Sequence, residues 1–259
     1  MEGLRQAILQ QKDAGKAIVV LNFPNNPTGY TPGIEEGEQI IGALLEGAEA
    51  GIHIIVLVDD AYFGLFYGSS LRESLFARLV GVHSRILPIR IDGATKEEYV
   101  TGLRVGFLTF GADNEQVLEA LEQKALGMIR STISSSPHPS QSFVLHALQS
   151  PDYEVQKSEK TQIIKERAHK AMAVLESGKY HDAWEPYPFN SGYFVCLKLK
   201  TVHPELLRVH LLDAYGVGTI ALNDTDLRLA IPCIEADQWE DLLAMIYSGI
   251  QELQQQHAR

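Results

Sequence analysis

Three short apolar runs, each ended by polar residues, are the feature that most constrains the fold of this chain. The runs span residues 17–21, 54–58 and 86–91, and segments with helical spacing separate them, at residues 34–50 and about 71–80. Strands that alternate with helices indicate βαβ units, in which neighbouring strands run parallel. Continuous apolar runs agree with this, because a parallel sheet is normally covered on both faces. We therefore expect an α/β fold with a mainly parallel sheet and helices on both faces.

A fourth apolar run, at residues 105–110, begins soon after Lys96, which follows the third run. A crossover between parallel strands takes about a dozen residues or more, and the stretch after Lys96 is too short for one. If the fourth run joins the sheet beside the third, it must run antiparallel. Helical spacing is also present at residues 1–15, 114–130 and 141–175, and we expect a break in the last of these at Ser150-Pro151.

The last third of the chain has a different pattern from the first. Short strand-like runs and two helical segments follow one another there, at residues 192–199, 204–215, 217–222, 227–231 and from Ala236 onward. This pattern is typical of a separate α+β domain. We expect residues 1–135 to form part of a large ligand-binding domain, residues 136–177 to be connecting helices, and residues 178–259 to be a smaller C-terminal α+β domain.

Composition narrows the range of partners and cellular compartments. The chain has 259 residues, 45% of them hydrophobic, and a formal net charge of −11. A surface this acidic repels phosphates and anionic lipids, so we expect neither nucleic acid nor membrane as a partner.

The two cysteines, Cys196 and Cys233, lie in apolar runs outside any metal-ligand spacing, and the nine histidines form no HxxxH pattern, so no metal is expected. The N-terminus lacks the apolar segment of a signal peptide, and no run is long enough to span a membrane. A soluble, cytoplasmic protein is expected.

Polar residues follow all three strands of the expected parallel sheet. Asn26 follows the first strand, Asp59 the second and Lys96 the third, and Tyr62 is close behind Asp59. Ligands of open α/β sheets bind beyond the carboxyl ends of the strands, which lie about 4.8 Å apart. A lone aspartate after a strand is usually a turn residue, and a lone lysine is usually a solvated charge. Taken together, the residues predict a small-molecule site that holds a lysine, an acid and an amide.

Several motifs occur in a fixed order along the chain: Asn26-Pro27-Thr28-Gly29, Asp59-Asp60-Ala61-Tyr62, Thr95-Lys96, Gly102-Leu103-Arg104-Val105-Gly106 and Leu227-Arg228-Leu229-Ala230. In order and spacing they resemble the class I/II aminotransferases of fold type I. The resemblance implies a partial PLP-transferase large domain followed by the small domain, with pyridoxal 5′-phosphate as cofactor. It also implies that an amino acid and a 2-oxo acid are the substrates and that the intact protein is a homodimer.

The resemblance implies a role for each matched residue of the cofactor site. Lys96 would form an imine with the cofactor aldehyde and then move a proton at the substrate α-carbon. Asp59 would pair with the pyridine nitrogen. The family places this acid three residues before the tyrosine, and that spacing selects Asp59 over Asp60. Asn26 and Tyr62 would form hydrogen bonds with the phenolic oxygen of the cofactor ring.

Three further residues would hold the anionic groups of cofactor and substrate. Arg104 would bind the cofactor phosphate with its guanidinium fork, and the Thr95 hydroxyl would add a contact unless it only caps a turn. Arg228 would bind the substrate α-carboxylate, the alternative being an ordinary surface arginine on an edge strand. Asn26, beside the substrate, would also contribute to its binding.

Two departures from the family pattern are present. Gly93 stands where the family commonly has a phosphate-binding serine. Only about 16 residues precede the first strand, where the family has an extensive segment, so the resemblance predicts an N-terminally truncated enzyme that is a poor catalyst alone. Another reaction on the same fold, such as β-elimination or decarboxylation, and an inactive fragment or interaction module remain as alternatives.

Overall fold

The computed structural model describes residues 1–257 of the protein. The chain forms two compact units, each built from segments that are separate in sequence. Unit 1 consists of Met1–Pro24, Thr31–Gly64 and Ser69–Lys157, and unit 2 of Asn25–Tyr30, Leu65–Gly68 and the chain from Ser158 onward.

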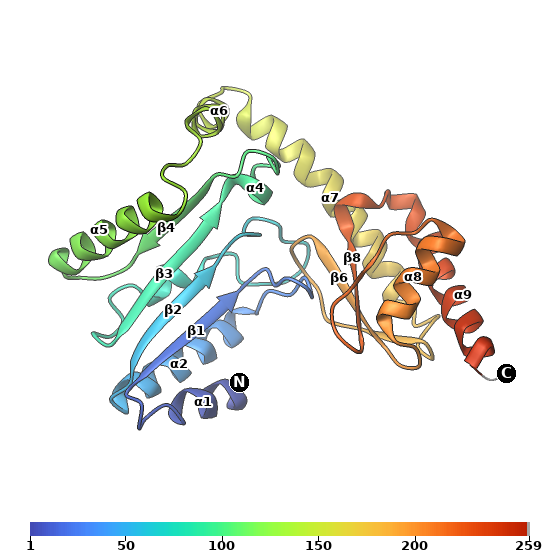
Figure 1. Ribbon diagram of the computed structural model, residues 1–259, viewed down its shortest axis with the longest axis horizontal. Coiled ribbons are helices and arrows are strands. Elements are labelled where there is room, and N and C mark those ends of the chain that lie inside the picture. Colours follow the sequence, from blue (N-terminus) through green and yellow to red (C-terminus); the bar gives the residue numbers. More distant parts are fainter. Residues whose placement is uncertain (258–259) are drawn as a thin grey trace. The chain divides into compact units, whose positions relative to one another are not determined.

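Unit 1 is built around a four-stranded sheet in the order β1-β2-β3-β4 (Figure 1). Its strands are β1 (Lys16–Asn22), β2 (His53–Asp59), β3 (Ile86–Gly93) and β4 (Gly106–Phe110). The first three strands are parallel, and β4 is antiparallel to β3. The predicted mainly parallel sheet with one antiparallel strand is therefore confirmed.

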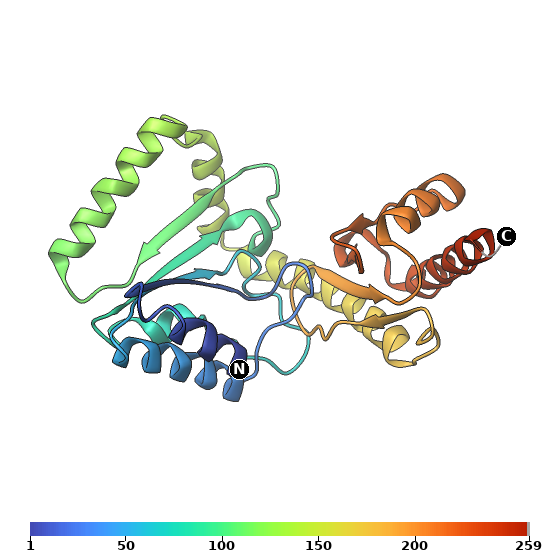
Figure 2. The same ribbon diagram turned by 60° about the horizontal axis from the view of Figure 1, so that its bottom comes forward.

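Helices α1 (Glu2–Leu9), α2 (Ile34–Glu49) and α3 (Leu75–Leu79) lie along one face of this sheet, while α5 (Glu115–Thr132) and α6 (His138–Leu148) lie on the opposite side (Figure 2). The apolar face of α2 packs on alternate strand residues, so that Leu44, Ile54 and Val56 share one core. Local sequence fixes the helix starts. The Glu36 side chain accepts the Gly33 N–H at the start of α2, and Asn114 accepts two N–H groups at the start of α5.

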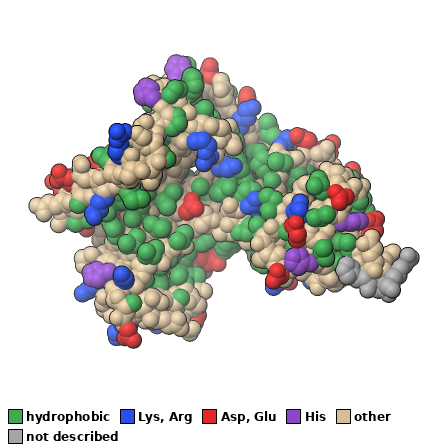
Figure 3. Space-filling model, in the orientation of Figure 1, with side chains coloured by type: hydrophobic (Ala, Val, Ile, Leu, Met, Phe, Trp, Pro, Cys, Tyr) green, Lys and Arg blue, Asp and Glu red, His purple; other side chains and the backbone are tan. Residues whose placement is uncertain are grey.

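The other face of the sheet is apolar and largely open. Side chains alternate between the two faces of a strand, and in β1 the side chain of Ile18 is 69% exposed and that of Val20 60%. By register, Ile18 lies beside Ile55 and Val20 beside Leu57. Figure 3 shows hydrophobic side chains gathered over the region of these strands. Helix α5 has no buried residue, so it leaves this face uncovered.

Unit 2 contains an antiparallel sheet in the order β5-β6-β8-β7. Its strands are β5 (Trp184–Pro186), β6 (Phe194–Leu199), β7 (Ile220–Ala221) and β8 (Asp226–Ala230), and two helices, α8 (Pro204–Tyr215) and α9 (Trp239–His257), accompany them. Two short 3-10 turns, Ile231–Cys233 and Ala236–Gln238, lead into α9. The core is formed by fully buried side chains of both helices and of the strands, among them Leu207, Leu211, Trp239, Leu243 and Ile246.

Helix α7 (Tyr153–Glu176) carries the chain from unit 1 into unit 2, and the change falls after Lys157. The expected break near residue 150 is present, because α6 ends at Leu148 and α7 begins at Tyr153. The expected domain boundaries at residues 135 and 177 remain predictions. None of the helices within residues 1–257 has the length and apolar character that a membrane span requires.

Candidate active site

Asp59 ends β2 with its carboxylate fixed by two neighbours. The parallel register places it beside Asn22, whose amide Nδ2 donates to Asp59 Oδ2 at 2.8 Å. The Ala61 N–H donates to Oδ1 at 3.2 Å. Because Asp59 alternates with the buried Val58, it lies on the open face of the sheet. A half-buried carboxylate is thus oriented toward the region that a ligand can reach.

Asp60, the alternative acid, has the opposite environment. Its side chain is 3% exposed and accepts bonds from Arg90 Nε and Ser74 Oγ, both at 2.6 Å. Burial raises the pKa of Asp60, and the bonds from Ser74 and Arg90 oppose that rise. Asp60 therefore connects β3 to the start of α3 inside unit 1, and its position supports Asp59 as the ligand-facing acid.

Lys96 lies in α4 (Ala94–Glu97), a single helical turn that follows β3 directly. Its Nζ is 5.8 Å from the centroid of the Tyr62 ring, within the range of a cation–π contact. Both side chains are half-buried, and Tyr62 lies three residues after Asp59. The acid at the end of β2, the tyrosine in the loop after it and the lysine in the turn after β3 thus lie at the carboxyl ends of adjacent strands.

Arg104 and Thr95 form the next part of the site. Arg104 Nη1 is 3.4 Å from Thr95 Oγ1, and the Arg104 backbone has φ 55°, a left-handed conformation that is uncommon for a residue with a side chain. Arg104 also lines a cavity of about 420 Å³ between the start of β4 and α6. A guanidinium beside a hydroxyl is suited to binding an anion.

The glycine at position 93 has a structural cause. A Cβ there would lie 3.0 Å from the carbonyl oxygen of Val105, because β4 passes closely beside it. The Gly93 N–H donates to Asp92 Oδ1 at 2.7 Å. This close strand pairing leaves no room for a serine side chain without a shift of β4, so any anion bound here depends more on Arg104 and Thr95.

Two predicted site residues, Asn26 and Arg228, meet in unit 2. Arg228 is on β8, and its Nη1 donates to Asn26 Oδ1 at 2.7 Å. The guanidinium also lies over the Phe194 ring, 4.3 Å from its centroid. Gly29 holds the Asn26 loop in place: it has φ 77°, and a Cβ there would lie 2.2 Å from the Phe194 carbonyl oxygen. The Phe194 ring and the Asn26 side chain thus orient the arginine fork.

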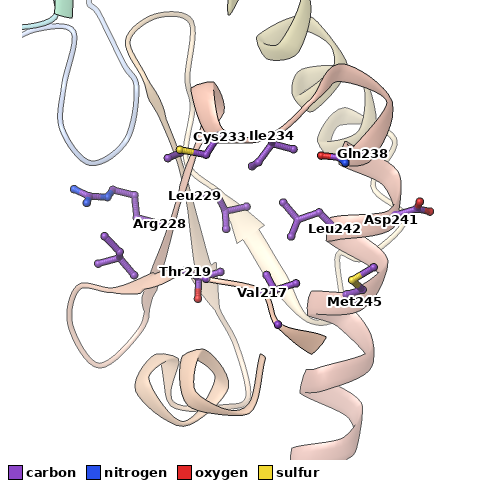
Figure 4. A pocket seen from close by; sticks show the side chains of 14 residues that line it. Val217, Thr219, Arg228, Leu229, Cys233, Ile234, Gln238, Asp241, Leu242 and Met245 are labelled. Atoms are coloured by element: carbon purple, nitrogen blue, oxygen red, sulfur yellow. The ribbon is translucent and has the colours of Figure 1, made fainter. Parts of the chain in front are cut away.

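A cleft of about 540 Å³ lies beside β8, between residues 216–220 and α9. Arg228, Leu229, Leu242 and Met245 are among the residues that line it. In Figure 4 the guanidinium end of Arg228 points away from Leu242 and Met245, and its Nη1 donates to Asn26.

The seven predicted residues fall into two groups. Unit 1 holds Asp59, Tyr62, Thr95, Lys96 and Arg104, and unit 2 holds Asn26 and Arg228. Sequence reasoning missed two neighbours of these residues. Asn22 was detectable, because it ends β1 as Asp59 ends β2, whereas the stacking of Phe194 on Arg228 has no local sequence signal. In residues 1–257, no group of three or more His, Cys, Asp or Glu side chains is placed to hold a metal ion.

The chain belongs to the aminotransferase class I and II family, whose model matches residues 1–246. Among curated proteins it is similar to the cytoplasmic aspartate aminotransferase of Saccharomyces cerevisiae, with 28% identity over 184 residues. The match covers 68% of this chain and 40% of the yeast protein. A probable aspartate/prephenate aminotransferase of Rickettsia conorii is 27% identical over 170 residues, which cover 65% of this chain and 38% of that protein.

Solved structures agree on the fold. An aminotransferase from Anaerococcus prevotii superposes with a TM-score of 0.80 at 21% identity, over 94% of this chain and 59% of the other. The aromatic aminotransferase of Pyrococcus horikoshii superposes with a TM-score of 0.71 at 16% identity, over 92% of this chain and 60% of the other. The predicted fold, a partial type I large domain with a smaller α+β domain, is thereby supported. The matches span 38–40% of the length of the two curated relatives and 59–60% of the two solved structures.

Proposed function

We propose that this chain carries the catalytic residues of a pyridoxal-phosphate-dependent aminotransferase that moves an amino group between an amino acid and a 2-oxo acid. The observation that carries the proposal is the arrangement at the carboxyl ends of β2 and β3, in a chain of this family. There an oriented carboxylate, Asp59, precedes Tyr62, whose ring lies against the amine of Lys96.

The residues of unit 1 fit the cofactor in their chemistry. Lys96 offers an amine next to Tyr62, Asp59 offers an acceptor for a ring N–H, and Arg104 with Thr95 offers donors for a phosphate. When bound, pyridoxal phosphate supplies an electron-accepting ring that stabilises negative charge at the substrate α-carbon. The Asn22 amide and the Ala61 N–H hold the Asp59 carboxylate, which would then be placed to accept a hydrogen bond from the protonated ring nitrogen.

Lys96 is proposed to hold the cofactor and to move the proton at the substrate α-carbon. The Tyr62 ring centroid lies 5.8 Å from the Lys96 amine, and the ring is proposed to limit the directions in which the amine can point. Arg228 is proposed to bind the substrate carboxylate with both arms of its fork, and the Phe194 ring and Asn26 orient that fork. Asn26 and the Tyr62 hydroxyl are proposed as hydrogen-bond partners of the cofactor ring oxygen.

The intact protein is proposed to be a cytoplasmic homodimer that binds neither nucleic acid nor membrane. Its net charge of −11 supports the last part, since acidic surfaces repel phosphates. Both cysteines are free thiols, which agrees with a reducing compartment. Sedimentation over a wide concentration range tests the dimer, and a purely monomeric protein would contradict it.

The cofactor role of Lys96 is tested by borohydride reduction in the presence of pyridoxal phosphate, followed by peptide mapping. We expect the label on Lys96 and its loss in Lys96→Ala. Lys124→Ala is the matched control, because Lys124 is exposed on α5, and it should leave the label unchanged. Label on Lys124 in the unmodified protein would refute the assignment.

The role of Arg228 is tested by Arg228→Lys in an active form of the protein. A point charge replaces the planar fork, so KM for the amino acid should rise strongly while cofactor binding stays nearly constant. Steady-state kinetics with several amino acids, beside a titration with pyridoxal phosphate, separates the two quantities. Unchanged KM values would show that Arg228 is an ordinary surface charge.

A further inference from the structure

A network of four side chains adjoins Lys96 and has no part in the chemistry proposed above. Glu97 and Glu98 follow Lys96 directly, and Tyr153 and Lys157 lie one turn apart at the start of α7. Lys157 Nζ donates to Glu98 Oε1 at 2.9 Å and to Glu97 Oε1 at 3.3 Å. The Tyr153 hydroxyl donates to Glu98 Oε2 at 2.6 Å and accepts a bond from Lys157 Nζ at 2.9 Å. The network is partly buried, where charge-assisted bonds are strong.

Helix α4, which carries Lys96, depends on outside contacts for its orientation. It has four residues, and one backbone bond of its single turn runs from Glu98 N to Ala94 O at 3.1 Å. A helix this short is not stable by itself. The chain leaves α4 through Tyr99 at φ 57°, a conformation that persists only where the surroundings impose it. Buried Ala94 holds one end of the turn, and Glu97 and Glu98 hold the other.

The charges of the network require Lys157 to be present and protonated. Burial raises the pKa of Glu97, against the attraction of Lys157. Burial opposes the charged form of Lys157, but the bonds to Tyr153 and Glu98 and the negative charges of Glu97 and Glu98 together outweigh it, so the pKa of Lys157 lies above its ordinary value. Without the ammonium, two adjacent carboxylates would stay half-buried without their cation, next to Lys96.

Glu97 also contacts the loop that carries Tyr62. Gly64, two residues after Tyr62, has φ 90°, and a Cβ there would lie 3.3 Å from Glu97 Oε1. The Glu97 carboxylate is therefore packed between this loop and the ammonium of Lys157. A displaced Glu97 would disturb both Lys96 and the loop of its aromatic neighbour.

We propose that Lys157 and Tyr153 are positioning residues for Lys96. They hold Glu97 and Glu98 and thereby fix the direction in which α4 presents the Lys96 amine, without touching the ligand themselves. The inference rests on the proposed role of Lys96 as the cofactor lysine. It assigns to the first turn of α7 a part in setting the reactivity of that amine.

The test measures two quantities. One is the rate at which borohydride reduction attaches pyridoxal phosphate to Lys96, and the other is the visible circular dichroism of the bound cofactor. Lys157→Met should slow labelling by about ten-fold to a hundred-fold and weaken the dichroism, since a misplacement of about 1 Å can cost 10²-fold. Tyr153→Phe should act in the same direction with a smaller effect. Lys157→Arg should restore both signals, because a guanidinium can bond both carboxylates. Lys160→Met, an exposed lysine on α7, is the matched control and should behave as the unmodified protein does.

The outcomes separate the two proposals. If the unmodified protein takes no label on Lys96, the proposed function fails and this inference fails with it. If the unmodified protein is labelled and Lys157→Met matches it in rate and dichroism, only the positioning role is overturned. Far-ultraviolet dichroism checks folding, and if Lys157→Met does not fold, Tyr153→Phe decides: an unchanged rate in that variant overturns the inference.

Discussion

The sheets of the two units distribute their apolar side chains differently. In unit 2, one face of β6 and β8 carries buried Val195, Leu197, Leu227 and Leu229, while the opposite face includes polar residues such as Arg228. In unit 1, the strands are apolar on both faces, but only the face toward α1, α2 and α3 is covered. An antiparallel sheet commonly has one solvated face, whereas parallel sheets occur almost only with both faces covered.

The two units obtain their stability in different ways. Unit 2 buries the apolar face of its sheet under its own helices, so its core is complete within the described residues. Unit 1 has one complete core and one apolar face in water, and the apolar stripe of α5 contributes no buried side chain. Equivalent substitutions should therefore have different effects in the two units and on the two faces of the first sheet.

The largest expected difference is between two leucines on helices. Leu243 on α9 has no exposed surface, and Leu126 on α5 is 51% exposed. Leu243→Ala should lower the free energy of unfolding of unit 2 by about 2–5 kcal/mol, through lost burial and a cavity. Leu126→Ala should change stability by no more than about 0.5 kcal/mol. Urea unfolding measures both, with the two units fitted separately because they need not unfold together.

Similar losses of stability in the two leucine variants would contradict the expected difference between the two units. They would mean that Leu126 is buried in the protein in solution, for example by association of the open surface of unit 1. Unfolding at several protein concentrations distinguishes that case, since association makes the transition depend on concentration.

A smaller difference is expected between the two faces of the parallel sheet. Ile54 on β2 is 1% exposed and faces α2, whereas Ile18 on β1 is 69% exposed. Ile54→Val should cost about 0.5–1.5 kcal/mol, and Ile18→Val close to nothing, because the removed methylene is already in water. Thermal or urea unfolding of the two variants checks this, and equal costs would show that the second face of the sheet is covered too.

Much of the first sheet was predictable because its strands are continuous apolar runs. The runs at 17–21, 54–58 and 86–91 fall within β1, β2 and β3, and the short gap after Lys96 correctly indicated an antiparallel β4. Helix α4 was not predicted, since four residues have no measurable period. Strand β5, with three residues, was missed for the same reason, and α3 is shorter than the predicted 71–80 because it begins only after the Ser74 cap.

The candidate site was predictable where it depends on strand order and not where it depends on contacts distant in sequence. Asp59 and Lys96 follow from polar residues at the ends of adjacent parallel strands. The membership of Asn25–Tyr30 in unit 2 depends on backbone contacts between Gly29 and Asn190, and no local pattern encodes them. The network of Lys157 with Glu97 and Glu98 joins segments about sixty residues apart, so only the folded chain reveals it.

The smallest expected difference concerns the acid dependence of stability, and it is between two ion pairs of similar geometry. In unit 1, Arg5 of α1 bonds Glu46 of α2 through two contacts of 2.6 and 2.7 Å. In unit 2, Arg208 donates two hydrogen bonds of 2.7 and 2.6 Å to Glu205, and both residues belong to α8. The side-chain bond from the arginine lowers the pKa of each glutamate below its ordinary value of 4.5. The first pair joins two helices, whereas the second only supports a helix that buried leucines already hold.

A carboxylate whose pKa is lower in the folded state adds stability above its unfolded pKa, and that stability is lost as the pH falls through the folded value. Glu46→Gln should therefore flatten the acid dependence of the urea midpoint of unit 1 below about pH 4.5. Glu205→Gln should do so less in unit 2, because loss of a pair within one helix leaves the packing of α8 intact. Both effects should be small, since exposed ion pairs contribute little and salt screens them. If Glu46→Gln retained the acid dependence of the unmodified protein, the contact between α1 and α2 would rest on Ile8 and its apolar neighbours alone.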